Sequence, residues 1–486
     1  MGSKVRLNEE NAKNLFGTLL NNTNFNTYNG KSIGDSTTIS VFFVTSQPNK
    51  NAISPMNSDM KLSYFTTPLL VCTALLFTGC KRDVFDPDAY EQVVKETFPI
   101  GTIDQGHTWN LTQSHAIKVK TNVNASVNVT NVRILSGNPF EKTGVEILAE
   151  KAAQRDGTYT LFFYSPAYQT TFYAAVVADN GQHILKAFSS SAEGVTFDTG
   201  SQYGSGKMND LTYQTYTYLF EENYPEPGDW DFNDLVLRVQ KLPSQQENTV
   251  RLSITLAAVG AKKQQAAAIR LVGYQAEDVE SVTTEDGRTF DGSYSLNRIF
   301  IENSDLLMSG RNGEAILNLF EDAHYALSPR LNSQDKGGGT IRMFYNTSRN
   351  PNGSTQAQIV PKTIVYQVKF RNPRLMDNFT LETLDVFSIE DFNSGKWEVH
   401  NFPYKAYQAI NDYGTNETAT SNNMAWALKI PSGTFKYPIE GQSLGLYKDG
   451  VLTGAYMEQN HSYGQWVASH TSCLDWFLYP TTGLVY

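Results

Sequence analysis

The chain has 486 residues, which is too long for one ordinary domain, so two or three domains are expected. Hydrophobic residues make up 40% and aromatic residues 12% of the sequence, a composition that supports buried cores and favours β-sheets. The formal net charge is −10 and no basic stripe is present, which argues against binding to nucleic acid and is compatible with an exported protein that binds cations.

Residues 60–79 have the organisation of a bacterial export signal. Lys61 supplies a short positive start, and the apolar stretch 69–77 is shorter than the roughly 20 residues of a permanent membrane helix. Thr78-Gly79 before Cys80 resembles a bacterial lipobox, and this resemblance implies cleavage before Cys80 and lipidation of its thiol. The sequence therefore predicts an outer-membrane lipoprotein of the cell envelope, held to the membrane by its lipid anchor, on either the periplasmic or the surface face.

The segments on either side of this signal lack a domain-like pattern. Residues 1–59 are rich in Asn, Ser and Thr and predict a disordered or mis-called leader, with Met60 as the true initiator. Residues 80–106 predict a tether with a short helix at 88–98, because Asp86-Pro87 is a typical helix start.

Two β regions follow the tether. Short strands separated by turn signals predict an N-terminal β-sandwich over residues 107–208. Residues 209–486 predict a second, larger β domain, with strands including 213–219, 235–240, 249–258, 339–344 and 363–370 and a helix at 314–324. The expected fold class is mainly β, with two tandem β-sandwich, jelly-roll-like domains.

An acidic loop lies between two predicted strands of the second domain. Its oxygen-bearing side chains are Glu221, Glu222, Asp229, Asp231, Asn233 and Asp234. Hard cations such as Ca²⁺ bind about six to eight oxygen ligands, and an unpaired carboxylate cluster repels itself, so the loop predicts a Ca²⁺ site. The loop is not an EF-hand, because strands flank it and Asp234 and Gln240 replace the required Gly and Glu. The alternatives are an acidic hairpin with turn hydrogen bonds to its backbone and a catalytic carboxylate pair.

The loop and the C-terminal region resemble the LruC-domain family of bacterial lipoproteins, known from Bacteroidetes and spirochaetes. Residues 228–236 look like the family's acidic signature, and the motifs at 398–400, 426–427, 435–438 and 475–477 occur in the family's order. The resemblance covers 209–486, and residues 107–200 resemble the N-terminal β domain of Bacteroides members. Ala425 stands where the family often has Pro. The family's biochemical function is uncharacterised, so the resemblance implies localisation and fold alone.

Three further residues are candidate ligand contacts in the second domain. Strand alternation places Glu398 and His400 on one face of a strand. The two residues are either a pair of metal ligands or an acid/base pair, or His400 is buried and holds a neighbouring strand by a hydrogen bond. Trp426 is a candidate surface for stacking on a sugar ring, with burial in the core as the alternative. Cys473 is the one cysteine outside the signal and its lipidation site, and we interpret it as structural.

The sequence thus favours a non-enzymatic, Ca²⁺-stabilised binding or adhesion module for a glycan or an envelope protein. This interpretation rests on the anchor, the β architecture and the lack of a catalytic motif in the sequence. One alternative is a glycan-active hydrolase with paired carboxylates, which requires two acids in a groove. The other is a structural subunit of a surface layer or fimbria, which requires an exposed edge strand.

Overall fold

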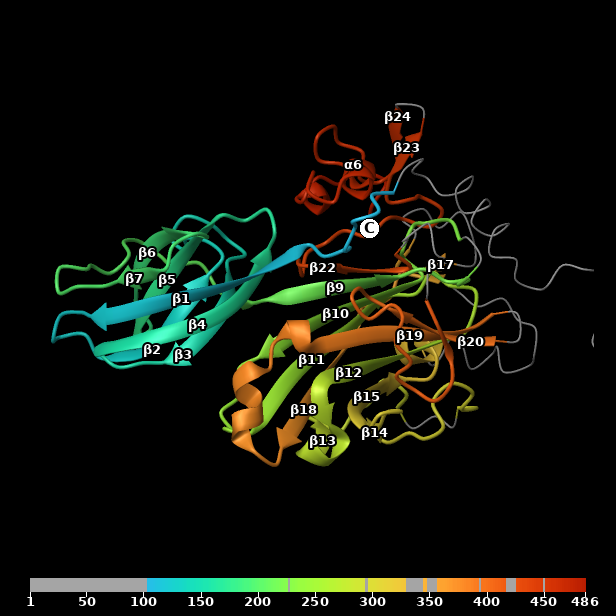
Figure 1. Ribbon diagram of the computed structural model, residues 1–486, viewed down its shortest axis with the longest axis horizontal. Helices are drawn as coiled ribbons and strands as arrows, with labels where there is room; N and C mark the ends of the chain where they lie inside the picture. Colours follow the sequence, from blue (N-terminus) through green and yellow to red (C-terminus); the bar gives the residue numbers. More distant parts are fainter. Residues whose placement is uncertain are drawn as a thin grey trace, which may run out of the picture. The chain divides into compact units, whose positions relative to one another are not determined.

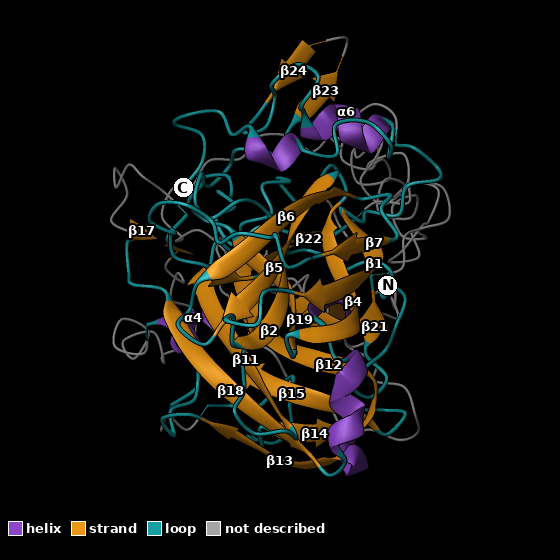
Figure 2. Ribbon diagram, turned by 90° about the vertical axis from the view of Figure 1, so that its left-hand side faces the viewer, coloured by secondary structure: helices purple, strands orange, loops and turns teal. Residues whose placement is uncertain are grey.

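The computed structural model describes residues 103–225, 228–292, 296–328, 344–347, 356–392, 395–416, 425–448 and 451–486. The leader, the export signal, Cys80 and the predicted helix at 88–98 lie outside the described residues. Within the described part the protein is mainly β, as predicted, and its helices are short (Figures 1 and 2). None of the described helices is long and apolar enough to span a membrane.

The N-terminal region forms two sheets, with strand orders β4-β1-β7 and β6-β5-β2-β3-β8. The strands are β1 (Thr112–Asn122), β2 (Val129–Leu135), β3 (Glu146–Ala152), β4 (Asp156–Pro166), β5 (Thr171–Ala178), β6 (His183–Ser189), β7 (Gly194–Thr196) and β8 (Thr212–Tyr213). Alternation along β1 buries Ile117 and Val119 while the residues between and beside them stay exposed. Both residues share one core cluster with Phe172 and Val176 of β5, so the two sheets pack as a sandwich.

The C-terminal region also has two large sheets. The first has the order β13-β18-β11-β10-β9-β22, and several of its strands lie side by side in Figure 1. Its strands are β9 (Thr215–Phe220), β10 (Leu235–Leu242), β11 (Thr249–Ala258), β13 (Val279–Thr284), β18 (Lys362–Phe370) and β22 (Ala427–Ile430).

The second sheet has the order β14-β15-β12-β19-β20-β21. Its strands are β12 (Gln265–Gln275), β14 (Leu307–Ser309), β15 (Glu314–Phe320), β19 (Leu384–Phe392), β20 (Gly395–His400) and β21 (Gly414–Thr415). Leu237 and Ile254 of the first sheet share a core cluster with Ile269 and Val386 of the second, so this region is a second sandwich.

Smaller elements complete the C-terminal region. The two-stranded sheets pair β16 (Phe344–Tyr345) with β17 (Gln356–Ala357) and β23 (Leu446–Lys448) with β24 (Val451–Thr453). The α-helices are α4 (Ala323–Leu327) and α6 (Tyr463–Ala468), and the 3₁₀ turns are η1 (Ala276–Asp278), η2 (Pro373–Asn378), η3 (Leu381–Thr383) and η4 (Trp476–Leu478).

The outer face of the second sheet is covered as well. A separate core cluster joins Ala268 of β12 and Phe387 of β19 to Phe300, Ile301 and Ala409 of the covering segments. Side chains of this sheet are therefore buried on both faces, and its polar residues need partners inside the protein.

The helix predicted at 314–324 is wrong, because residues 314–320 form strand β15. Every residue of this strand after Glu314 is buried, since one face packs between the sheets and the other lies under the outer cover. A strand buried on both faces reads as a continuous apolar run, which periodicity cannot distinguish from a buried helix. The predicted strand at 339–344 lies outside the described residues except for Phe344.

Candidate metal centre

The acidic loop connects two neighbouring antiparallel strands, β9 and β10. Phe220 pairs with Leu235 at the base of this hairpin, and both residues are fully buried. The strands form because β-branched and aromatic residues are packed on both sides of them. The loop at 221–234 is therefore held at both ends by a rigid part of the core.

The loop curls around the carboxylate of Glu221, which is fully buried. The backbone N–H groups of Trp230 and Phe232 donate to its two oxygens at 2.9 and 3.0 Å. Both donors have left-handed backbones, with φ of 62° and 55°. Their rings are buried in the core, where Trp230 lies 5.0 Å from the ring of Trp426.

Three of the six predicted metal ligands lie close together in the structure. Ligand atoms of Glu221, Asp229 and Asp231 all lie within 4.8 Å of one another. Two oxygens on one Ca²⁺ are separated by at most about 5 Å, because each Ca–O distance is about 2.3–2.6 Å. Gly228 also approaches closely, since an added Cβ would lie 2.0 Å from Glu221 Oε1. The three carboxylates therefore have the spacing of a cation site.

The other three predicted ligands have partners in the chain. Asp234 Oδ2 accepts the N–H of Glu222 at 2.6 Å, and Glu222 Oε2 accepts the N–H groups of Lys262 and Lys263 at 3.1 and 3.2 Å. Asn233 Nδ2 donates to the carbonyl of Pro438 at 3.2 Å. Glu222 and Asp234 thus fit the hairpin interpretation, in which acidic side chains cap backbone amides.

Burial and mutual repulsion act on the carboxyl groups of this cluster. Burial, followed by the charge of Asp229, raises the pKa of both Glu221 and Asp231 well above its usual value. Burial and the charge of Glu221 have the same effect on the pKa of Asp234. In the described part of the chain, the ion pairs of Lys and Arg side chains do not include any of these three residues, although the charge of Lys262 acts on the neighbouring Asp229. The raised pKa values mean that these acids are neutralised either by protons or by a bound cation.

Sequence reasoning missed one acidic residue of this region, Glu440. Burial and the charges of Asp229 and Glu222 raise its pKa to about 7. The adjacent Gly441 donates its N–H to Asp231 Oδ2 at 2.8 Å, which holds this segment against the loop. No local pattern marks Glu440, because its role depends on a contact between distant segments of the chain.

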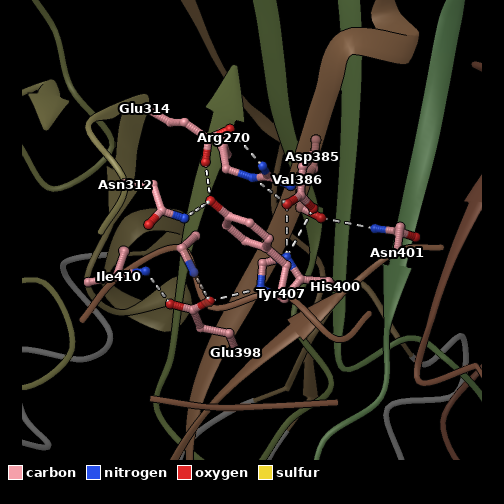
Figure 3. Close-up of polar contacts among 11 residues, drawn as sticks. Arg270, Asn312, Glu314, Asp385, Val386, Glu398, His400, Asn401, Tyr407 and Ile410 are labelled. Atoms are coloured by element: carbon pink, nitrogen blue, oxygen red, sulfur yellow. Dashed lines mark hydrogen bonds and ion pairs between the residues drawn. The ribbon is translucent and has the colours of Figure 1, made fainter. Parts of the chain in front are cut away.

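Glu398 and His400 lie on the outer face of the second sheet and are fully buried (Figure 3). The Nδ1 atom of His400 is 3.0 Å from both oxygens of Asp385, and Nε2 is 2.9 Å from Glu398 Oε2. Burial by itself lowers the pKa of His400, but the neighbouring Asp385 and Glu398 carboxylates raise it to about 9. The ring is therefore an imidazolium that donates to both acids at neutral pH.

The same network includes Arg270, whose Nε donates to Asp385 at 3.0 Å and whose Nη1 donates to Glu314 at 2.9 Å (Figure 3). The ring of Tyr407 covers the guanidinium group at 3.6 Å. Glu398 also accepts backbone N–H groups from residues 409 and 410, so the network pins the outer segment to the sheet. Each charge is paired inside the chain, and the geometry favours the structural alternative for His400 over a metal or acid/base pair.

The structure places Trp426 in the core, with 1% of its surface exposed. Its ring packs against Tyr224 at 5.2 Å and Trp230 at 5.0 Å. Stacking of Trp426 on a sugar ring is therefore not supported. Cys473 is half-buried and lines a cavity of about 510 Å³ with Asn460, Gln465, Ala468 and Ser472.

Comparisons with known proteins give a domain match and a structural likeness. The model of a domain of unknown function (DUF4842) matches residues 248–477. The crystal structure of a candidate lipoprotein from Bacteroides ovatus aligns at 15% identity with a TM-score of 0.45, over 74% of this chain and 99% of that chain. No curated protein matches. The resemblance to the LruC-domain family stays an interpretation of the sequence motifs.

Proposed function

We propose that the protein is a lipid-anchored envelope protein whose C-terminal sandwich binds Ca²⁺ at the acidic loop. In this proposal it acts as a non-enzymatic binding or adhesion module for a glycan or another envelope protein. The observation that carries the metal site is the close approach of Glu221, Asp229 and Asp231 within 4.8 Å. Such an arrangement of carboxylates costs free energy unless a cation or protonation neutralises it, and we propose Ca²⁺ for this role.

The donor atoms favour Ca²⁺ over a transition metal. The three gathered side chains offer oxygen alone, whereas Zn²⁺ sites in proteins usually contain His or Cys. Asp229 is exposed while Glu221 and Asp231 are buried, so the cation would enter from the Asp229 side. Backbone carbonyls and water would complete the coordination, as is usual for Ca²⁺.

Melting of the full chain with Ca²⁺ and with chelator tests the metal site. We expect Ca²⁺ to raise the melting temperature of the wild type. The melting temperature of Asp231→Asn should not change with Ca²⁺, because this variant keeps the size of the side chain and loses its charge. Asp156→Asn, at an exposed position of β4, is the matched control and should respond like the wild type. Equal melting of the wild type in both conditions would refute the Ca²⁺ site.

The cavity beside Cys473 is a candidate surface for a ligand. It is lined by amide, hydroxyl, methyl and thiol side chains. Amides and hydroxyls can hydrogen-bond to sugar hydroxyls. Glycan-array binding of the full chain, with and without chelator, distinguishes a glycan ligand from a protein ligand. Release of sugar from a bound glycan would contradict the non-enzymatic role.

The envelope location rests on the sequence 60–80. Mass spectrometry of the protein from its native membrane tests it, because lipidation adds acyl mass to the peptide that begins at Cys80. We expect the apolar stretch 69–77 to be absent from the mature protein. A bare thiol with that stretch still attached would exclude the lipid anchor.

A further inference from the structure

A second group of oxygen atoms meets beside Gly260, which follows β11. An ideal Cβ on Gly260 would lie 2.0 Å from Asn233 Oδ1 and 3.1 Å from Glu440 Oε2. The two oxygens are therefore separated by no more than about 5 Å, which is the span of two ligands on one Ca²⁺. The space between them exists because residue 260 has no side chain.

Both oxygens are buried and have no close hydrogen-bond donor in the described part of the chain. The Thr347 hydroxyl also faces the Glu440 carboxyl group and acts to lower its pKa. Asn233 is fully buried, and its amide nitrogen is fixed on the carbonyl of Pro438, so its oxygen is directed away from that contact. Two acceptor atoms at this distance repel each other and lose their hydration. A cation between them would satisfy both.

The segments that carry these atoms are held together independently of any ion. Gly260 donates its N–H to the carbonyls of Asn233 and Asp234 at 3.1 and 3.0 Å. Gly441, beside Glu440, donates to Asp231 Oδ2 at 2.8 Å. The pair of oxygens is thus preorganised by backbone contacts, which reduces the ordering cost of binding.

We propose that Asn233 Oδ1 and the Glu440 carboxylate bind a second cation beside Gly260, next to the one held by Glu221, Asp229 and Asp231. Glu440 is not among the residues whose ligand atoms all lie within 4.8 Å of one another, and in this proposal its position is a second one. The choice of ion rests on the proposed function, since both positions offer hard oxygen ligands. The second cation joins the acidic loop to the C-terminal segment at 438–441.

A shared proton is the competing explanation. A protonated Glu440 would donate to Asn233 Oδ1 and satisfy both atoms without a metal. The raised pKa of Glu440, about 7, makes this state accessible in the absence of Ca²⁺. Glu440→Gln separates the two cases, because its amide can donate to Asn233 as the protonated acid would, yet it provides no negative charge to a cation.

Calorimetric titration of the full chain with Ca²⁺, after removal of divalent ions, tests the proposal. We expect two equivalents for the wild type and one for Glu440→Gln and Gly260→Ala. Gly260→Ala places a methyl group in the space between the oxygens without removing a charge. Glu458→Gln, at an exposed glutamate, and Gly137→Ala, where the nearest side-chain atom is 3.4 Å from the new Cβ, are the controls and should bind two.

Asp229→Asn should lose the first position and keep the second, because Asp229 belongs to the first group alone. One equivalent in the wild type, with or without a weaker affinity in Glu440→Gln, would overturn a separate second position. No Ca²⁺ binding by the wild type would instead reject the proposed function on which the choice of ion rests. Melting of each apo variant shows whether it is folded, and Glu440→Gln decides the outcome if Gly260→Ala does not fold.

Discussion

The acidic loop and the His400 network are two buried groups of carboxylates with opposite arrangements. In the network, Asp385 and Glu398 contact His400, and Arg270 lies between Asp385 and Glu314. In the loop, Glu221 and Asp231 have backbone amide donors and face other acids. In the network, each carboxylate contacts at least one of two cations, Arg270 and His400. In the loop, the buried carboxyl groups have raised pKa values and lack such an ion pair within the described part of the chain.

The comparison gives a criterion that distinguishes structural carboxylates from candidate metal ligands. Both groups are buried, so burial alone does not separate them. The deciding observation is whether the chain supplies cationic donors for the carboxylates. The contacts favour a role in stability for the network, and cation binding is what we propose for the loop.

The largest effect is expected for His400→Ala. The substitution leaves Asp385 and Glu398 buried without their shared cation, and breaking a buried ion pair costs about 3–5 kcal/mol. Denaturant unfolding measures this loss in the free energy of unfolding. His461→Ala, which removes a partly exposed contact with Asp475, is the control and should cost less than about 1 kcal/mol. Equal losses in the two variants would contradict the assigned role of His400.

A smaller effect is expected from Ca²⁺ at the loop. A ligand at 100 times its dissociation constant stabilises the folded state by about 2.7 kcal/mol. Urea unfolding with and without Ca²⁺ measures this difference. His400→Ala should keep the Ca²⁺-dependent increase, because the network does not contribute ligands to the loop. Loss of the increase in that variant would show that the two groups are not independent.

The pH dependence of stability should separate the two groups. Without Ca²⁺, the raised pKa of Glu440 means that the folded state holds a proton that the unfolded state releases, so stability falls as pH rises from about 4.5 to about 7. Ca²⁺ should reduce this decline without removing it, because Glu146 and Glu390, with pKa values raised to about 7 and about 8, contribute to the same window. The protonated His400 stabilises the folded state. This contribution is fully present below about pH 6.5 and is lost as the pH rises through about 9.

Melting temperatures across both windows, with and without Ca²⁺, measure these slopes. His400→Gln should reduce the decline between about pH 6.5 and 9, to which Glu390 also contributes up to about pH 8, and leave the effect of Ca²⁺ near pH 7 intact. A decline that is unchanged in this variant would assign the upper window to another group.

The smallest effect is expected for Tyr407→Phe. The variant keeps the aromatic ring over Arg270 and removes the hydroxyl that contacts Glu314 and Asn312. One hydrogen bond to a partly exposed charged group contributes about 1 kcal/mol, which denaturant unfolding can resolve. A loss comparable to that of His400→Ala would mean that the hydroxyl, and not the buried ion pairs, holds the network together.

The fold class and the position of the acidic loop can be predicted from the sequence alone. The strand predicted at 249–258 is β11, and the short strands predicted within 107–208 are present, β1 among them. The acidic residues of 229–234 are neighbours in the chain, so their proximity requires no tertiary information. Strand alternation also places Glu398 and His400 on one face of a strand, and β20 has them there.

The ion-pair and hydrogen-bond partners of the buried acids depend on the tertiary structure. Asp385, Glu398 and His400 meet because β19 and β20 are paired in register, and Arg270 reaches them from β12. Glu440 approaches the loop only because a distant segment is held there by Gly441. Local spacing carries no information about such contacts, and the charge balance of a buried carboxylate depends on them. The helix predicted at 314–324 is wrong for the same reason. Residues 314–320 form a strand whose second face is buried by segments elsewhere in the chain.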